Sequence, residues 1–225
     1  MEYLLLCILP IGLAFWAQMR VSSAYSKWSQ VSSRIGMTGA EVAKAVMRSA
    51  GIDNVDIVEI PGHLTDHYDA QNKRLALSSE NYHGTSLAAL GVSAHESGHA
   101  IQDKEHYPAL NLRMQLVPMT NFASSILPLV IFGAVFFRMF SLIYVAVAFY
   151  LILAIFQLVT MPVEFDASRR ALQRLQGLGI LTAPEMVGAR DVLKAAAWTY
   201  VAAFIAALGN LLYWLSLASG NRRRS

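Results

Sequence analysis

The 225-residue chain has little cysteine and little charge, and both shortages exclude whole classes of protein. Its single cysteine, Cys7, excludes an intramolecular disulfide, so cysteine says nothing about the redox compartment. Only 15% of the residues are charged, against about 25% in ordinary soluble domains, while 55% are hydrophobic and the mean hydropathy is +0.42. This balance predicts an integral membrane protein.

Four apolar stretches are long enough to span a bilayer: residues 4–19, 116–137, 139–160 and 195–218. None contains Asp, Glu or His, which argues against a metal transporter, because the spans of such a protein carry buried ligands. Only Arg138 separates the middle two stretches, which predicts a tight hairpin. The first stretch has Glu2 before it, no basic n-region and no clean A-x-A site, so we expect a retained anchor rather than a signal peptide.

The net charge of +3 does not indicate a nucleic-acid partner, because the lysines and arginines are scattered and flank the spans, where lipid headgroups attract them. Near the span ends, ten bases lie on the side of the polar region 21–115 and four on the other, namely Arg138 and the arginines of 222–224. The positive-inside rule then favours a cytoplasmic site, although the arginine tail argues the opposite.

The polar region between the first two spans is predicted to mix helix and strand. A helix is expected over 39–50, because Thr38 and Glu41 form a capping box and Gly51 follows as a stop. Residues 55–60 and 73–78 read as strands. The second of these is either an edge strand that pairs with an extended peptide, or an ordinary core strand. The sequence leaves both readings open.

The most informative segment is His-Glu-Ser-Gly-His from His95 to His99, which matches the H-E-x-x-H pattern of zinc proteases. Residues i and i+4 share a helix face, so both imidazoles can reach one metal while Glu96 serves as a base toward water. A shuffled chain of this composition would show the pattern about 0.006 times. Apolar neighbours predict a buried helix, with Thr85 or Ser86 as its N-cap and Pro108 beyond its end.

A zinc with two histidine ligands needs a third protein ligand, and segment 161–170 returns to the correct membrane side after the hairpin. Pro162 suits the first turn of a helix through Arg174. We choose Glu164 as the ligand, and Asp166, about 200° away around the helix, is the alternative or holds an imidazole N–H. The plainer reading is an interfacial helix whose two acids pair with its arginines.

With these residues in view, the chain resembles the YugP-like putative neutral zinc metallopeptidases of bacterial membranes. The matching stretches are residues 61–69, 91–102 and 163–168 and the Ala-Ala-Trp-Thr-Tyr-Val run before the last span. More distantly it is similar to the HtpX and CAAX-prenyl-protease group, in which His95, His99 and Glu164 match the ligands and Glu96 the base. Ser168 stands where that group has Asp, so the role of that Asp does not carry over.

The expected fold is a mainly α integral membrane protein with about four transmembrane helices and a small α+β zincin-like metalloprotease domain between spans one and two. The expected parts are an anchor at 1–20, the zincin-like domain at 21–115 and a hairpin at 116–160. A third-ligand helix with its connector follows at 161–194, and a last span with a basic tail at 195–225. The resemblance implies one Zn²⁺ per chain and a bacterial plasma membrane.

The leading hypothesis is a zinc-dependent endopeptidase that acts on membrane proteins or peptides. Tyr200, His67 and His83 are candidates to stabilise the oxyanion, although each also fits an ordinary interfacial, turn or surface role. Asp66, His67 and Asp69 could form a second metal site, but their spacing is unconvincing.

The rival hypothesis is a non-catalytic, zinc-stabilised membrane scaffold or adaptor. A structural zinc usually has four ligands, often Cys, whereas Cys7 is far from the motif and Glu96 is present. The expected partners are a protein or peptide substrate and the lipid bilayer, with room for a membrane partner or a homo-oligomer. The sequence names no substrate.

Overall fold

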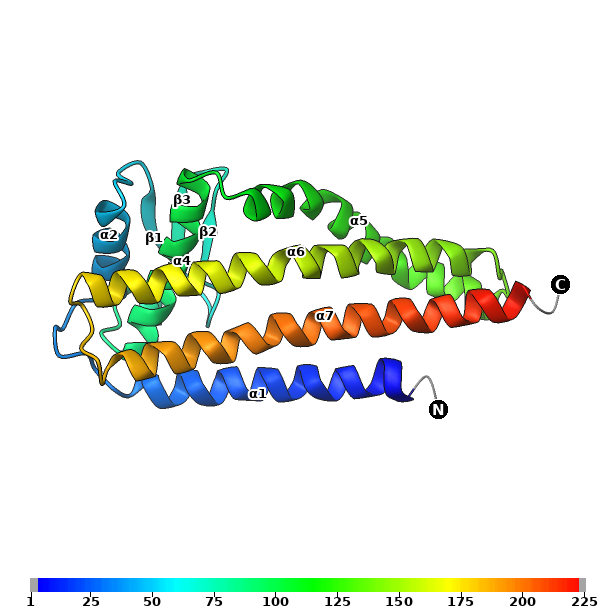
Figure 1. The fold of residues 1–225 in the computed structure, drawn as a ribbon, viewed down its shortest axis with the longest axis horizontal. Coiled ribbons are helices and arrows are strands. Elements are labelled where there is room, and N and C mark those ends of the chain that lie inside the picture. The colour runs from blue at the N-terminus through cyan, green and yellow to red at the C-terminus, as the bar shows by residue number, and fades with distance from the viewer. Residues whose placement is uncertain (1–3, 223–225) are drawn as a thin grey trace. The chain divides into compact units, whose positions relative to one another are not determined.

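The computed structural model of the chain describes residues 4–222 (Figure 1). The first three residues, including Glu2, and the last three, which hold part of the predicted basic tail, lie outside the described residues. The prediction of a mainly helical chain with a small amount of sheet is confirmed. The helices and strands in chain order are η1 Leu4–Ile8, α1 Leu9–Ser29, α2 Gly39–Ser49, β1 Asp56–Ile60, β2 His67–Asp69, β3 Arg74–Ser78, α3 Ser79–Tyr82, α4 Leu87–Lys104, α5 Pro108–Phe136, α6 Leu142–Gly177 and α7 Met186–Arg222.

Four helical stretches are long and apolar enough to cross a membrane: Leu5–Ser29, Pro108–Phe136, Leu142–Gly177 and Met186–Ser219. Each covers most or all of one of the four apolar stretches expected from the sequence. The expected helix start at Pro162 is wrong, because α6 runs without a break from the apolar stretch through Pro162 to Gly177. A proline removes one backbone donor, and neighbouring residues of a long helix can tolerate that loss.

The chain forms two compact units. One, here called the apolar unit, consists of Met1–Ala17, Asn111–Met161 and Trp198–Ser225. The other, here called the mixed unit, consists of Gln18–Leu110 and Pro162–Ala197. The mixed unit therefore combines the polar region between the first two spans with the C-terminal part of α6 and the N-terminal part of α7.

Local signals set the start of α2 in the mixed unit. The Thr38 side chain accepts a hydrogen bond from the Glu41 backbone N–H, and the Glu41 carboxylate accepts one from the Thr38 N–H, so the predicted capping box is confirmed. Gly51 follows the helix with φ +67°, a conformation that favours glycine. The apolar face of α2 is buried, with Val42 and Val46 fully enclosed in a core shared with β3, α4 and α6.

The sheet has the strand order β1-β3-β2, with β1 parallel and β2 antiparallel to β3. Because β3 lies between two strands and is buried over most of its length, the edge-strand interpretation of 73–78 is wrong and the core-strand interpretation holds. The sequence analysis missed β2, a strand of three residues that pairs Tyr68 with Leu75. Such a short segment carries too little alternation to be recognised.

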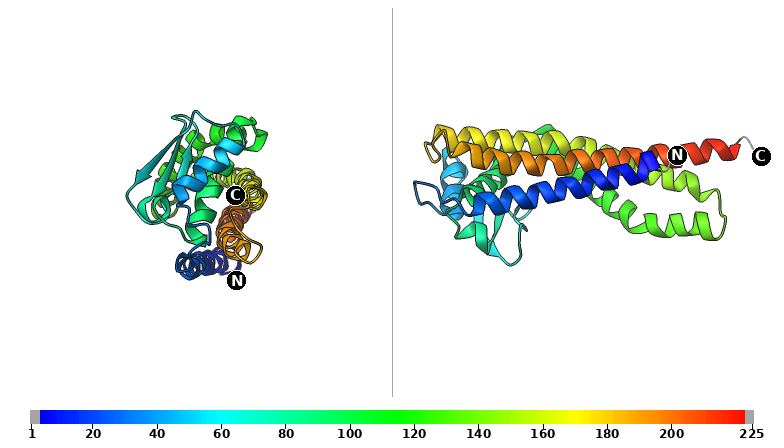
Figure 2. Two further views of the ribbon diagram at one scale, coloured as in Figure 1. Left: turned by 90° about the vertical axis from the view of Figure 1, so that its left-hand side faces the viewer. Right: turned by 90° about the horizontal axis from the view of Figure 1, so that it is seen from below.

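Within the mixed unit, α6 and α7 run side by side in opposite directions and are joined by a short connection at 178–185 (Figures 1 and 2). Asp191 fixes this part of α7 to the end of α1. Its carboxylate accepts hydrogen bonds from the Arg20 guanidinium at 2.7 Å and from the Trp28 indole N–H at 2.9 Å. The first turns of α6 beyond Pro162 pack against α4, with Gly98 facing the backbone of Ala167.

Candidate metal centre

Helix α4 carries two of the predicted metal ligands, His95 and His99. Its N-terminus is capped by Ser86, whose hydroxyl accepts a hydrogen bond from the Ala89 N–H, so Ser86 rather than Thr85 is the cap. The two imidazoles lie one turn apart, with ring centroids 4.9 Å apart and the rings nearly perpendicular. His99 is buried and His95 is partly buried. Both rings therefore face the same small space.

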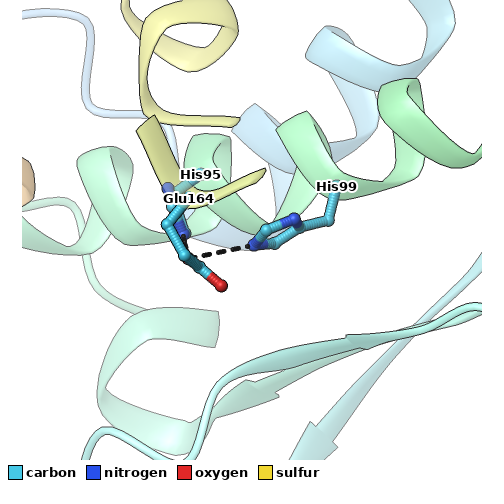
Figure 3. A group of neighbouring side chains, drawn as sticks. All are labelled: His95, His99 and Glu164. Atoms are coloured by element: carbon cyan, nitrogen blue, oxygen red, sulfur yellow. Dashed lines mark hydrogen bonds and ion pairs between the residues drawn. The ribbon is translucent and has the colours of Figure 1, made fainter. Parts of the chain in front are cut away.

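Glu164 of α6 reaches into the same space, beside both imidazoles (Figure 3). Its Oε2 atom lies 3.2 Å from His95 Nε2 and 3.4 Å from His99 Nε2, and its side chain is only 3% exposed. Across residues 4–222, these three residues form the one group whose ligand atoms could hold a metal ion, all lying within 4.8 Å of one another. The structure thus brings together the three ligands expected from the sequence.

The close approach of α4 to α6 depends on small residues at the contact. A Cβ added to Gly98 would lie 2.5 Å from the backbone oxygen of Ala167, so only glycine fits there. On α6, Val163, Ala167 and Ala171 are fully buried and continue the small apolar surface beside Glu164. Gly98 therefore sets the helix separation that allows Glu164 to reach both histidines.

We expect Gly98→Ala to destabilise the mixed unit by about 1–3 kcal/mol, because α4 and α6 must move apart to admit the methyl group. Thermal unfolding of the purified protein in detergent measures this change. Gly177→Ala is the matched control, because an added Cβ at Gly177 meets nothing within 4 Å. Equal melting temperatures for the two variants would contradict the proposed packing.

Gln102, which the sequence analysis did not single out, orients His99. Its buried side-chain amide donates to the backbone oxygen of Val163 at 2.8 Å and to the Asp166 carboxylate at 3.0 Å. Both acceptors require the NH₂ group, so the amide oxygen faces His99 Nδ1, 3.0 Å away, and Nδ1 must be the donor. His99 therefore carries its proton on Nδ1, which leaves the Nε2 lone pair directed at Glu164.

His95 has a comparable support on α6. Its Nδ1 atom lies 3.1 Å from the Ser168 hydroxyl, which can accept the ring N–H. Asp166 does not belong to the metal-ligand group. Its carboxylate pairs with Arg169 and Arg170 and accepts a hydrogen bond from Gln102, which in turn contacts His99. Asp166 therefore does not hold an imidazole N–H directly, as the alternative expected.

Gln102→Met should weaken zinc binding by about 10–100-fold, because the variant keeps the side-chain volume but loses the acceptor that fixes His99. Competition with a chelator of known affinity measures the effect. Gln173→Met, at an exposed position of α6, is the control and should leave the zinc affinity unchanged. Equal affinities for the two variants would show that Gln102 does not position the ligand.

Burial opposes a positive charge on His99, but the carboxylate of Glu164 outweighs this effect and raises the pKa of His99 above its ordinary value. A buried carboxylate facing two imidazole nitrogens thus attracts a cation. A tetrahedral zinc with ligand distances of about 2.0–2.1 Å needs its ligand atoms about 3.3 Å apart. The separations from Glu164 Oε2 to the two imidazole nitrogens, 3.2 and 3.4 Å, are close to that value, and all three ligand atoms lie within 4.8 Å of one another. The donor set of two imidazoles and one carboxylate is one that zinc uses.

Glu96 differs from the three predicted ligands in having no fixed partner. Glu96 is buried, with only 8% of its surface exposed, yet its carboxylate makes no hydrogen bond or ion pair within residues 4–222. Its negative charge acts on His99, so it lies close to the same space. A carboxylate held beside the candidate metal ligands without a fixed partner is available to exchange a proton with water.

The remaining candidates are spread over the molecule. His67 on β2 is exposed and its Nδ1 lies 2.9 Å from the Thr65 backbone oxygen, while His83 pairs with Glu59 at 3.1 Å. Tyr200 lies on α7 in the apolar unit, and its role stays a prediction.

The second metal site suggested by Asp66, His67 and Asp69 does not form. Asp66 accepts hydrogen bonds from Ser78 and Asn81, and Asp69 from the turn that follows β2. Their carboxylates are thus satisfied by separate local partners, and no second metal-ligand group occurs in the described part of the chain.

Two comparisons with known proteins bear on this site. A family described as "Putative neutral zinc metallopeptidase" matches residues 3–219. The chain is also 40% identical over 222 residues to a Bacillus subtilis (strain 168) protein named "Putative membrane protease YugP", with 99% of each chain covered. No solved structure matches the chain.

Proposed function

This chain belongs to the putative neutral zinc metallopeptidase family, and from that membership and its site we propose that it is a membrane-embedded, zinc-dependent endopeptidase. The proposed reaction is hydrolysis of peptide bonds in membrane proteins or peptides. One observation carries the proposal. His95, His99 and Glu164 converge on a single point while Glu96 beside them has no fixed partner.

The proposed ligands are the Nε2 atoms of the two histidines and the Glu164 carboxylate, with one zinc per chain. Zinc bound there supplies a Lewis acid that polarises the scissile carbonyl and lowers the pKa of a water molecule toward about 7. Three protein ligands suit catalysis, because a structural zinc site is usually closed by four.

Glu96 is proposed as the general base. Its carboxylate takes the proton from the attacking water and then delivers it to the nitrogen of the leaving amine. Gln102 and Ser168 contact the Nδ1 atoms of His99 and His95 and so keep the Nε2 atoms turned toward the proposed metal. Tyr200 is proposed, from the sequence alone, as a hydrogen-bond donor to the oxygen that becomes negative during attack.

The proposed location is a bacterial plasma membrane with the site on the cytoplasmic side. Support comes from the four long apolar helices, from the excess of bases near the span ends on the site side and from the bacterial relative named as a membrane protease. The non-catalytic scaffold is less well supported, because a scaffold has no use for the unpaired, buried Glu96.

Metal removal tests the proposal. Purified protein in detergent should contain about one zinc per chain by elemental analysis and should cleave an unfolded substrate such as casein. Dialysis against a chelator should abolish cleavage, and one equivalent of zinc should restore it. Protein that binds no zinc would overturn the proposal, and protein that binds zinc but cleaves no peptide would favour the scaffold.

A further inference from the structure

A groove of about 430 Å³ lies between α6 and α7 of the mixed unit, and apart from Ser168 its lining residues have no part in the proposed peptidase reaction. Three cations line it: Arg169 from α6, and Arg190 and Lys194 from α7. None of the residues that line it is acidic. The groove therefore offers a concentrated positive charge inside a shaped hollow.

Two of these cations have no ion-pair partner in the part of the chain that the structure describes. Arg169 pairs with Asp166, but Arg190 and Lys194 are exposed and form no ion pair with any of residues 4–222. Some other bases of the mixed unit are engaged in ion pairs, such as Arg20 with Asp191 and Arg170 with Glu105. Because Arg190 and Lys194 are four residues apart on one helix face, they can act on one anion together.

The groove also has an apolar floor and an apolar end. Leu172 and Leu193 lie among its lining residues near the cations, and Phe165 and Ala197 close one end. Because α6 and α7 run in opposite directions, Phe165, near the first residue of α6 in the mixed unit, and Ala197, the last residue of α7 in it, belong to the same end of the groove. The cations come next along the groove, and Gln173 and Gln176 lie towards its other end.

This order, apolar then cationic then amide, matches the order of chemical groups in a phospholipid, from acyl chain to phosphate to polar headgroup. We propose that the groove binds the headgroup of an anionic membrane phospholipid, with Arg190 and Lys194 as the phosphate ligands. The proposal rests on the membrane location given above. Ser168 lines the same groove and lies 3.1 Å from His95 Nδ1, so the bound lipid would lie directly behind a proposed metal ligand.

Native mass spectrometry of the full chain in detergent, titrated with phosphatidylglycerol or phosphatidylcholine, tests the proposal. Wild type should retain phosphatidylglycerol with higher affinity than phosphatidylcholine. The double variant Arg190→Gln and Lys194→Gln should lose about tenfold or more of its affinity for phosphatidylglycerol, because it removes both proposed phosphate ligands. Equal retention of the two lipids by wild type would overturn the proposal.

The double variant Lys44→Gln and Arg48→Gln is the matched control, because it removes two exposed charges four residues apart on α2 of the same unit. It should bind phosphatidylglycerol like wild type. Equal losses in the two double variants would mean that net charge, not the groove, attracts the lipid, and would overturn the proposal. So would an unchanged affinity in the groove variant.

Inorganic phosphate distinguishes a lipid from a free anion. Millimolar phosphate should not displace phosphatidylglycerol, because the acyl chains add apolar contacts that phosphate lacks, and displacement at equal affinity would overturn the lipid assignment. The readout is lipid retention, not peptide cleavage. A negative result in these lipid experiments would overturn the lipid proposal but not the zinc site or the proposed peptidase. A wild type that retains the lipid but cleaves no peptide would contradict only the proposed function.

Discussion

Glu96→Gln is expected to slow peptide hydrolysis by about 10²–10⁴-fold while zinc stays bound, because the amide cannot accept the proton of the attacking water. The substitution keeps the size and shape of the side chain. Since Glu96 makes no hydrogen bond or ion pair with the rest of residues 4–222, its replacement breaks no structural contact. Rates of casein cleavage and zinc content, measured on the same preparation, check both parts of the prediction.

Glu59→Gln is the control for the loss of one negative charge. Glu59 is an exposed glutamate on β1 that pairs with His83, and its replacement removes the same single charge from the mixed unit. We expect this variant to cleave at the wild-type rate. If Glu96→Gln kept full activity, Glu96 would not be the base and the proposed reaction would have to use another group.

Glu164→Gln is expected to lower zinc affinity by about 10²–10⁴-fold. Zinc sites in small domains are worth about 10–16 kcal/mol, and one of three protein ligands supplies roughly a third of that, or about 3–5 kcal/mol. The neutral amide is a poor ligand and also removes the negative charge that holds the cation between the two imidazoles. Zinc titration against a competing chelator measures the loss.

Asp166→Asn is the informative partner experiment, because Asp166 is also buried, lies two residues away on α6 and was the alternative ligand. Its loss should cost stability, through the ion pairs with Arg169 and Arg170, but should change zinc affinity by no more than about tenfold. If the two variants exchanged these phenotypes, Asp166 would be the ligand and Glu164 its support.

The parts of the molecule that depend on nearby residues could be predicted from the sequence. The capping box of Thr38 and Glu41 acts within one turn, and the structure has it as predicted. The i, i+4 spacing of His95 and His99 fixes their common face wherever the helix lies. Glu164 could be chosen because the two intervening spans return the chain to the same side of the membrane, which is an argument about topology and not about packing.

Features that depend on long-range packing could not be predicted. Gln102 lies three residues from His99, but its role follows from the Val163 carbonyl on another helix, which no sequence pattern reveals. The central place of β3 depends on β2, which is too short to recognise. Helix α6 continues without a break past Pro162, although proline lacks the backbone N–H of a helical hydrogen bond. A proline in a sequence by itself suggests a helix end, and only the packing of the long helix shows otherwise.

The contact between Gly98 and Ala167 also bears on which ions the site would accept. Because main-chain atoms meet there, the spacing of α4 and α6 has a lower limit that no change of side-chain rotamer can alter. Glu164 Oε2 lies 3.2 and 3.4 Å from the two imidazole nitrogens, which suits an ion with bonds of about 2.0 Å, whereas calcium needs bonds of 2.3–2.6 Å and six to eight oxygen ligands. A glycine without chemical function of its own would therefore help to select the metal by ionic radius.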